Sequence, residues 1–199
     1  MATTAAPYGL KPVKRADGQP YAGATSTYLI DPAGEATNIF NGQVVTIGAD
    51  GYIALATGSG ADLTTNNLGG ASIGAIGVFV GCEYVNDQGQ TVHSQYYPAN
   101  ALNAKAMVVD DPNVLFQAQL DGAGGQTIIG STTTFAAVQS TSTGSTSTGN
   151  STSALDATVG TAAAPFKIVA HVSPASDAYP DVLVKFANGA HMMTMDSGV

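Results

Sequence analysis

The residues best spaced for catalysis are a glycine- and serine-containing pattern near the middle of the chain. Residues 70–74, GASIG, match the G-x-S-x-G pattern of serine hydrolases, with Ser72 at the nucleophile position. Asp110 or Asp111 and then His171 follow in the order of that catalytic triad. The chemistry also requires a helix directly after the serine, whereas the residues that follow are rich in glycine and strand formers. We therefore expect a glycine-rich entry into a strand and keep a serine esterase as the least favoured alternative.

Residues that could hold a metal are scattered along the chain. His93, His171 and His191 are far apart and show no ligand-like spacing. The carboxylates in residues 110–113, DDPN, could chelate calcium, but Asp, Pro and Asn are also standard turn formers. The sequence predicts a turn there, and neither a metal nor another cofactor.

The single cysteine, Cys82, excludes both an internal disulfide framework and a cysteine-rich zinc site. It shares an alternate-residue pattern with Val80 and Tyr84, which favours a buried thiol acting as a small apolar group. No lysine or arginine is adjacent in sequence to lower its pKa. No set of residues supports catalysis, so we predict that the protein is not an enzyme.

The charge of the chain constrains its partners. Only 10% of residues are charged, against roughly 25% in typical domains, so we expect that much of the surface is buried against other subunits or solvated by Ser, Thr and Asn. The balance of 6 basic and 14 acidic residues excludes nucleic acid as the main ligand, which would require the opposite sign. No signal peptide and no apolar run of about 20 residues is present, so we expect no membrane partner and a protein that is made and assembled in the cytoplasm.

Alternating apolar residues separated by turn signals predict an all-β fold, a small barrel or sandwich of short antiparallel strands. Residues 44–47 and 52–56 flank an Asp-Gly turn, and residues 76–85 and 91–97 form a second candidate hairpin. On the strand 76–85, every second residue from Ile76 to Tyr84 is expected on one face. A third hairpin is expected around residues 110–113, with alternation continuing over the residues that follow it, and the only helical candidate is a short turn near 152–158.

Two segments differ from the rest of the chain. Residues 1–23 carry three prolines together with Lys11, Lys14 and Arg15, which predicts an extended N-terminal arm whose cations dock onto an acidic surface. Residues 139–153 contain only Gln, Ser, Thr, Gly and Asn, which predicts a flexible, exposed loop within the β-domain of residues 24–199.

Three segments carry a resemblance to a known family. They are NIFNGQVV (38–45), IGVFVGCEY (76–84) continuing to QYYPA (95–99), and MVVDDP (107–112). Together these segments resemble the head decoration, or cement, proteins of tailed bacteriophages, in particular virion proteins of podophages and cyanophages. They are also loosely similar to the small β-barrel of lambda-type decoration proteins.

The resemblance implies a mechanical function. The protein would bind the major capsid protein on the outside of a phage head, at junctions between capsomers, and oppose the pressure of packaged DNA. A homotrimer on the capsid exterior is the implied assembly, with Lys11, Lys14 and Arg15 as candidate contacts. The alternative is a phage tail or fibre component or a carbohydrate-binding β-domain, although the chain has no tryptophan to stack on sugars.

Overall fold

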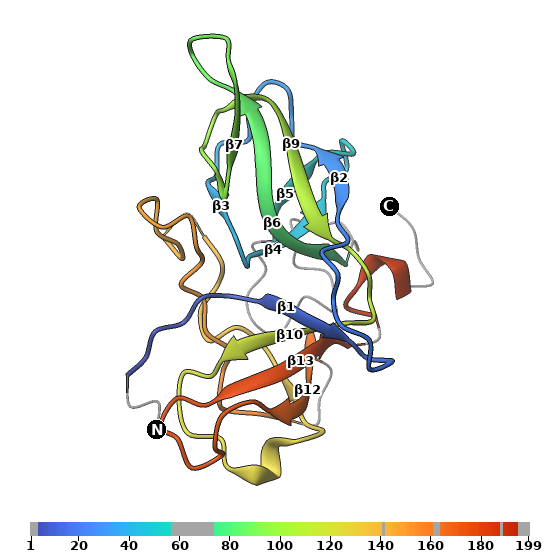
Figure 1. The fold of residues 1–199 in the computed structure, drawn as a ribbon, viewed down its shortest axis with the longest axis vertical. Coiled ribbons are helices and arrows are strands. Elements are labelled where there is room, and N and C mark those ends of the chain that lie inside the picture. Colours follow the sequence, from blue (N-terminus) through green and yellow to red (C-terminus); the bar gives the residue numbers. More distant parts are fainter. Residues whose placement is uncertain (1–3, 57–73, 141, 161–163, 188, 195–199) are drawn as a thin grey trace.

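The computed structural model describes residues 4–56, 74–140, 142–160, 164–187 and 189–194. Over these residues the protein is all-β, as predicted, with antiparallel strands and two short 3₁₀ helices, η1 (Gln126–Ile128) and η2 (Met192–Thr194). Figure 1 shows two main sheets, one above the other. None of the sheets closes into a barrel, so the sandwich of the two predicted architectures fits better.

The lower sheet in Figure 1 has five strands, all antiparallel. Their order is β1 (Lys11–Arg15), β10 (Val114–Gln119), β13 (Asp181–Phe186), β12 (Phe166–His171) and β11 (Thr132–Thr133). Strands β12 and β13 are a hairpin in sequence, whereas β1 and β10 come from distant parts of the chain. The sheet therefore joins the two ends of the sequence.

The upper sheet has six strands. Their order is β2 (Ser26–Leu29), β9 (Leu102–Val109), β6 (Ala75–Val85), β4 (Val44–Ile47) and β5 (Ile53–Leu55), and β7 (Thr91–Ser94) pairs with the second half of β6. A separate ribbon pairs β3 (Ile39–Phe40) with β8 (Tyr96–Tyr97). An isolated bridge between Ile30 and Ile53 brings the two edges of the six-stranded sheet together without closing it.

Two apolar clusters hold this arrangement together. The larger lies between the two sheets and includes Val44 and Val78 from the upper sheet and Phe116, Phe166 and Val184 from the lower one. The second lies on the opposite face of the upper sheet, where β3 and β8 contribute Ile39 and Tyr97. Because the larger cluster draws on both sheets, we infer one continuous core rather than two independent domains.

Two predicted hairpins are confirmed. Strands β4 and β5 pair around Gly51, whose φ of 82° is the left-handed conformation that an Asp-Gly turn supplies. Strands β6 and β7 pair in register from Cys82–Ser94 to Val85–Thr91.

The prediction that one face of β6 carries every second residue from Ile76 to Tyr84 is wrong. Val78 packs in the cluster between the sheets, whereas Ile76, Phe79 and Cys82 pack in the other cluster. The register shifts opposite β4 near Thr46 and opposite β9 between Phe79 and Gly81. Each such β-bulge adds an unpaired residue and reverses which face the following side chains occupy.

The predicted hairpin around residues 110–113 is also wrong. Strand β9 before this turn belongs to the upper sheet, and β10 after it belongs to the lower sheet. The turn therefore carries the chain from one sheet to the other. The alternation that follows it is confirmed, since Val114, Phe116, Ala118 and Leu120 all pack between the sheets.

The N-terminal segment is not a free arm. Leu10 is fully buried in the cluster between the sheets, and β1 pairs with β10 as the edge of the lower sheet. Pro12 lacks an amide hydrogen, which is tolerated on an edge strand. Beyond the turn at residues 16–19, Pro20 bridges Lys14 and the amide of Tyr21 reaches the carbonyl of Val13, so the chain itself covers part of this edge.

The segment 139–153 is not the wholly exposed loop that was predicted, because four of its described residues, Gln139, Gly149, Ser151 and Ser153, are buried, although residues 146–148 are exposed. Gln139 bonds the backbone of Val44 and Ala56, so the segment is fastened to β4. The predicted helical turn near 152–158 is absent as well: residues there form isolated bridges, among them Leu120–Leu155.

Candidate functional site

Four of the six basic residues of the chain lie on the outer face of the lower sheet. Residues that are directly paired across antiparallel strands project from the same face. The inward residues of β10 and β13, such as Phe116 and Val184, pack between the sheets, so their neighbours in sequence project outward. The register then places these outward lysines on three strands: Lys11 and Lys14 on β1, Lys185 on β13 and Lys167 on β12.

Three of the four lysines, Lys14, Lys185 and Lys167, lie in one row across the sheet. Lys14 pairs with Leu115, and Lys185 pairs directly with Lys167. Lys11 lies beside Gln117 in the neighbouring row. We call the outward surface that carries these four residues the lysine face.

Two like charges directly opposite each other weaken a sheet. Lys167 is exposed, and its neighbour Lys185 is partly buried and donates a hydrogen bond to the Asn113 side chain over 3.2 Å. Asn113 is neutral, so this contact does not neutralise the pair. The opposed lysines therefore lower the stability of the free protein, but they favour binding when an anionic surface covers them.

The lysine face contrasts with the rest of the molecule. Without its four lysines the chain would carry two cations against 14 carboxylates. Asp181 borders the face on β13, and its carboxylate already accepts hydrogen bonds from the Tyr8 hydroxyl (3.1 Å) and the Gln117 amide (3.2 Å). The lysine face therefore gathers four of the six basic residues of an acidic chain.

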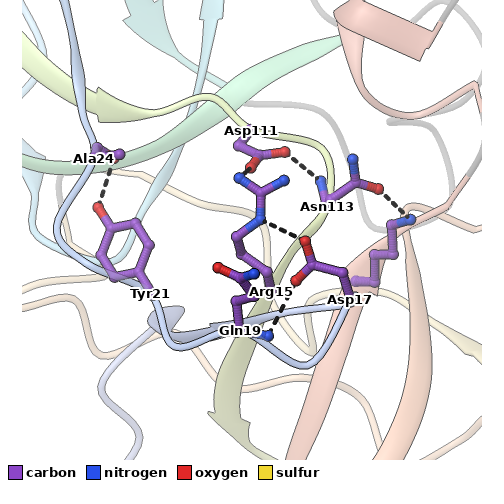
Figure 2. A network of polar contacts seen from close by, with 8 residues as sticks. Arg15, Asp17, Gln19, Tyr21, Ala24, Asp111 and Asn113 are labelled. Atoms are coloured by element: carbon purple, nitrogen blue, oxygen red, sulfur yellow. Dashed lines mark hydrogen bonds and ion pairs between the residues drawn. The ribbon is translucent and has the colours of Figure 1, made fainter.

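Arg15, a predicted contact residue, plays a different part from Lys11 and Lys14. It pairs with the inward-facing Val114, and its guanidinium lies between Asp111 (2.9 Å) and Asp17 (3.2 Å), as Figure 2 shows. Asp111 belongs to the turn that connects the two sheets. Arg15 thus ties the edge strand to that turn, whereas Lys11 and Lys14 are exposed on the lysine face.

Among the residues that the structure describes, the other chemical groups singled out in the sequence do not come together in one site. Ser72 lies outside the described residues, so the hydrolase pattern is not placed. His93 lies on β7, His171 ends β12 with Nε2 2.9 Å from the Gly125 carbonyl oxygen, and His191 is buried behind Phe186. Within the described ranges, no three His, Cys, Asp or Glu side chains lie close enough together to hold a metal ion.

Both carboxylates of the turn at residues 110–113 are engaged by the protein itself. Asp110 accepts a hydrogen bond from the Tyr28 hydroxyl at 2.7 Å. Burial, and after it this hydrogen bond, raises the pKa of Tyr28 to about 12. Asp111 binds Arg15 and accepts a hydrogen bond from the Asn113 amide. These contacts fix the crossover between the sheets.

Cys82 is buried, and burial raises the pKa of its thiol to about 12. Its sulfur lies 3.4 Å from the Tyr96 carbonyl oxygen. The protonated, enclosed thiol is a poor nucleophile. In the described part of the chain, no helix is long and apolar enough to cross a membrane.

Lys167 and Lys185 were not among the predicted contact residues. The signal was nevertheless present, because each lies between two inward apolar residues: Phe166 and Ile168 for the first, Val184 and Phe186 for the second. The outward phase of these two strands predicts two exposed lysines, and only the pairing of the strands brings them together.

No family model matches the chain, and comparison with curated proteins and with solved structures finds no similar protein.

Proposed function

We propose that the protein is a non-enzymatic structural component of a virion that docks through its lysine face onto an acidic protein surface. The observation that carries the proposal is the opposed pair Lys167 and Lys185, in the same row across the sheet as Lys14, on a chain with a formal net charge of −8. Complementary charge guides association and sets orientation.

The sequence resemblance to head decoration proteins suggests which protein provides this acidic surface. On that basis the partner is the major capsid protein, bound on the outside of a phage head at junctions between capsomers. Docked there as a homotrimer, the protein would strengthen the shell against packaged DNA. Symmetric repetition lets many individually weak charge contacts add up to firm attachment.

A nucleic-acid partner is the main competitor for a lysine face. The whole chain repels a polyanion, because acidic residues outnumber basic ones by 14 to 6. The outward residues between the lysines, Leu115, Gln117 and Leu183, carry no aromatic ring, and the hydroxyl of Tyr8 at the border of the face is already bonded to Asp181. A folded acidic protein surface fits this face better.

The experiment uses the full chain and the major capsid protein encoded in the same genome. Co-expression of the two should yield particles that carry the chain on their exterior, and purified chain should bind naked heads in a sedimentation assay. Binding should weaken as salt is raised from 50 to 500 mM, because screening acts on exposed charges. A chain that does not sediment with heads, or that binds double-stranded DNA more tightly than heads, would refute the proposal.

A further inference from the structure

A cleft of about 720 Å³ lies on the upper sheet, between the turn that connects β6 to β7 and the segment that leads into β9. This turn is at the top of Figure 1, and the lower sheet lies at the opposite end of the molecule. The volume falls in the range of roughly 300–1,000 Å³ that is typical of small-ligand sites. The lysine face does not contribute any residue to the cleft.

One wall of the cleft is the turn at residues 86–90, whose backbone is hydrogen-bonded within the turn itself. The Asn86 side-chain oxygen accepts hydrogen bonds from the amides of Gln88 (3.1 Å) and Gln90 (2.9 Å), and the Gly89 amide bonds the Asn86 carbonyl oxygen (2.9 Å). These bonds hold the turn in place without using the side chains of Asp87 and Gln88, which are exposed.

The other wall, residues 98–103, is held in place by hydrogen bonds to a buried tyrosine. The hydroxyl of Tyr97 accepts a hydrogen bond from the Glu35 amide (2.9 Å) and donates one to the Ala101 carbonyl oxygen (2.9 Å). The Asn100 amide donates to the Glu35 carbonyl oxygen at 2.7 Å. Asn100 and Asn103 have φ angles of 63° and 51°, left-handed conformations that asparagine tolerates better than most residues. This wall is therefore ordered before any ligand arrives.

The side chains around the cleft keep free hydrogen-bonding capacity. Across the described residues, no hydrogen bond or ion pair engages the side chains of Tyr84, Asp87, Gln88, Asn100 or Asn103. Partial burial, followed by electrostatic repulsion from its neighbours, raises the pKa of Tyr84, so its hydroxyl is protonated at neutral pH and can donate.

We propose that this cleft binds a neutral saccharide. A carboxylate accepts and three amides both donate and accept, which matches the mixed donor and acceptor character of adjacent sugar hydroxyls. Leu102, which is 50% exposed, and Tyr84 supply apolar surface for the C–H face of a sugar ring. Among the described residues that line the cleft, Asp87 alone is charged, so sialylated or sulfated sugars are disfavoured.

This site is independent of the docking proposed for the lysine face. The two surfaces lie on different sheets, so a molecule attached through the lower sheet still presents the cleft. Sugar binding can therefore fail while capsid docking holds, and the reverse.

The test is a glycan array of neutral and acidic oligosaccharides probed with the full-length chain, followed by calorimetric titration of the best neutral glycan. Asn103→Gly removes the side chain without straining a left-handed residue and should weaken binding at least tenfold, with an unchanged melting temperature. Gln88→Ala should weaken binding as well. Its matched control is Gln19→Ala, an exposed turn glutamine on the lower sheet, which should bind like the wild type.

Three results would overturn the proposal. They are the absence of any neutral glycan ligand on the array, a preference for acidic glycans, and wild-type affinity in both Asn103→Gly and Gln88→Ala. Neutral-glycan binding that both variants reduce, while the Gln19→Ala control retains it, supports the site.

Discussion

Replacing Gln139 by alanine should destabilise the protein strongly, although the residue begins a segment of low sequence complexity. Gln139 is 1% exposed, and its side chain makes three hydrogen bonds to the backbone. Its oxygen accepts from the Val44 amide (2.9 Å), and its nitrogen donates to the carbonyl oxygens of Ala56 (3.0 Å) and Val44 (3.3 Å). Alanine leaves the Val44 amide without this partner inside the core.

The size of the effect follows from these contacts. A buried polar group without a partner costs about 1–3 kcal/mol, and a second buried group, the Ala56 carbonyl, loses a donor as well. The Val44 carbonyl still accepts from the Ala56 amide at 3.1 Å, so its loss is small. With the cavity added, we expect about 4 kcal/mol, which for a domain of this size lowers the melting temperature by roughly 8–16 °C.

The assay is thermal and urea unfolding followed by circular dichroism, with native-state hydrogen exchange at the Val44 amide. Exchange there should accelerate in Gln139→Ala more than at amides of the lower sheet. The control is Gln19→Ala, which removes an exposed glutamine side chain and should change the melting temperature by less than about 2 °C. A melting temperature of Gln139→Ala within 2 °C of the wild type would refute the packed state of this segment.

Three further predictions address other buried residues. Leu10→Ala should lower the free energy of unfolding, measured in urea, by about 2–5 kcal/mol, because Leu10 is fully buried. An unchanged free energy would instead support an N-terminal segment that does not pack on the core. Burial lowers the pKa of His191 below its ordinary value of 6.5, so the unfolded chain binds a proton that the native state does not. The free energy of unfolding should therefore fall as the pH drops below about 6.5, and His191→Leu should remove that slope. Cys82 should resist iodoacetamide until the protein unfolds, because its thiol is buried and protonated; rapid alkylation of the native protein would contradict this.

The all-β class and two hairpins could be predicted from the sequence because they depend on local signals. Alternating apolar residues and an Asp-Gly turn specify adjacent antiparallel strands without reference to the rest of the chain. The alternation after Val114 was read correctly for the same reason, since a strand with one buried face shows it in its own residues.

The partner of each strand was harder to predict. The turn at residues 110–113 has the composition of a hairpin turn, yet it leads from one sheet to the other. A turn sequence predicts that the chain changes direction, but it does not predict which strand the following segment pairs with. No sequence signal marks the bulges in β6 either. After Ile76 they change which face of the strand each side chain occupies, so the predicted alternation fails there.

Composition misled most in the segment 139–153. Ser, Thr, Gly and Gln are typical of solvated loops, but here small size is what permits close packing. A Cβ on Gly144 would collide with the ring of Phe40, so only glycine fits against that ring. Gln43 completes the contact by donating to the Thr143 hydroxyl oxygen at 2.8 Å.

The candidate surface was predicted in part. Lys11 and Lys14 were recognised from their position in the N-terminal segment, and both lie on the lysine face. Lys167 and Lys185 are more than 150 residues away in sequence from these two, and only the strand order β1-β10-β13-β12 gathers them.

The most direct test of the lysine face is a paired measurement on Lys167→Gln, taking unfolding free energy and affinity for phage heads together. Removing one of two opposed charges should leave the free protein as stable or more stable by a few tenths of a kcal/mol, while weakening head binding by roughly 1.4–5-fold per contact. Lys105→Gln removes the same charge from the upper sheet, where Lys105 pairs with Glu83 at 2.9 Å, and should leave head binding unchanged. If Lys167→Gln binds heads like the wild type, or if Lys105→Gln weakens binding equally, the lysine face is not the docking surface.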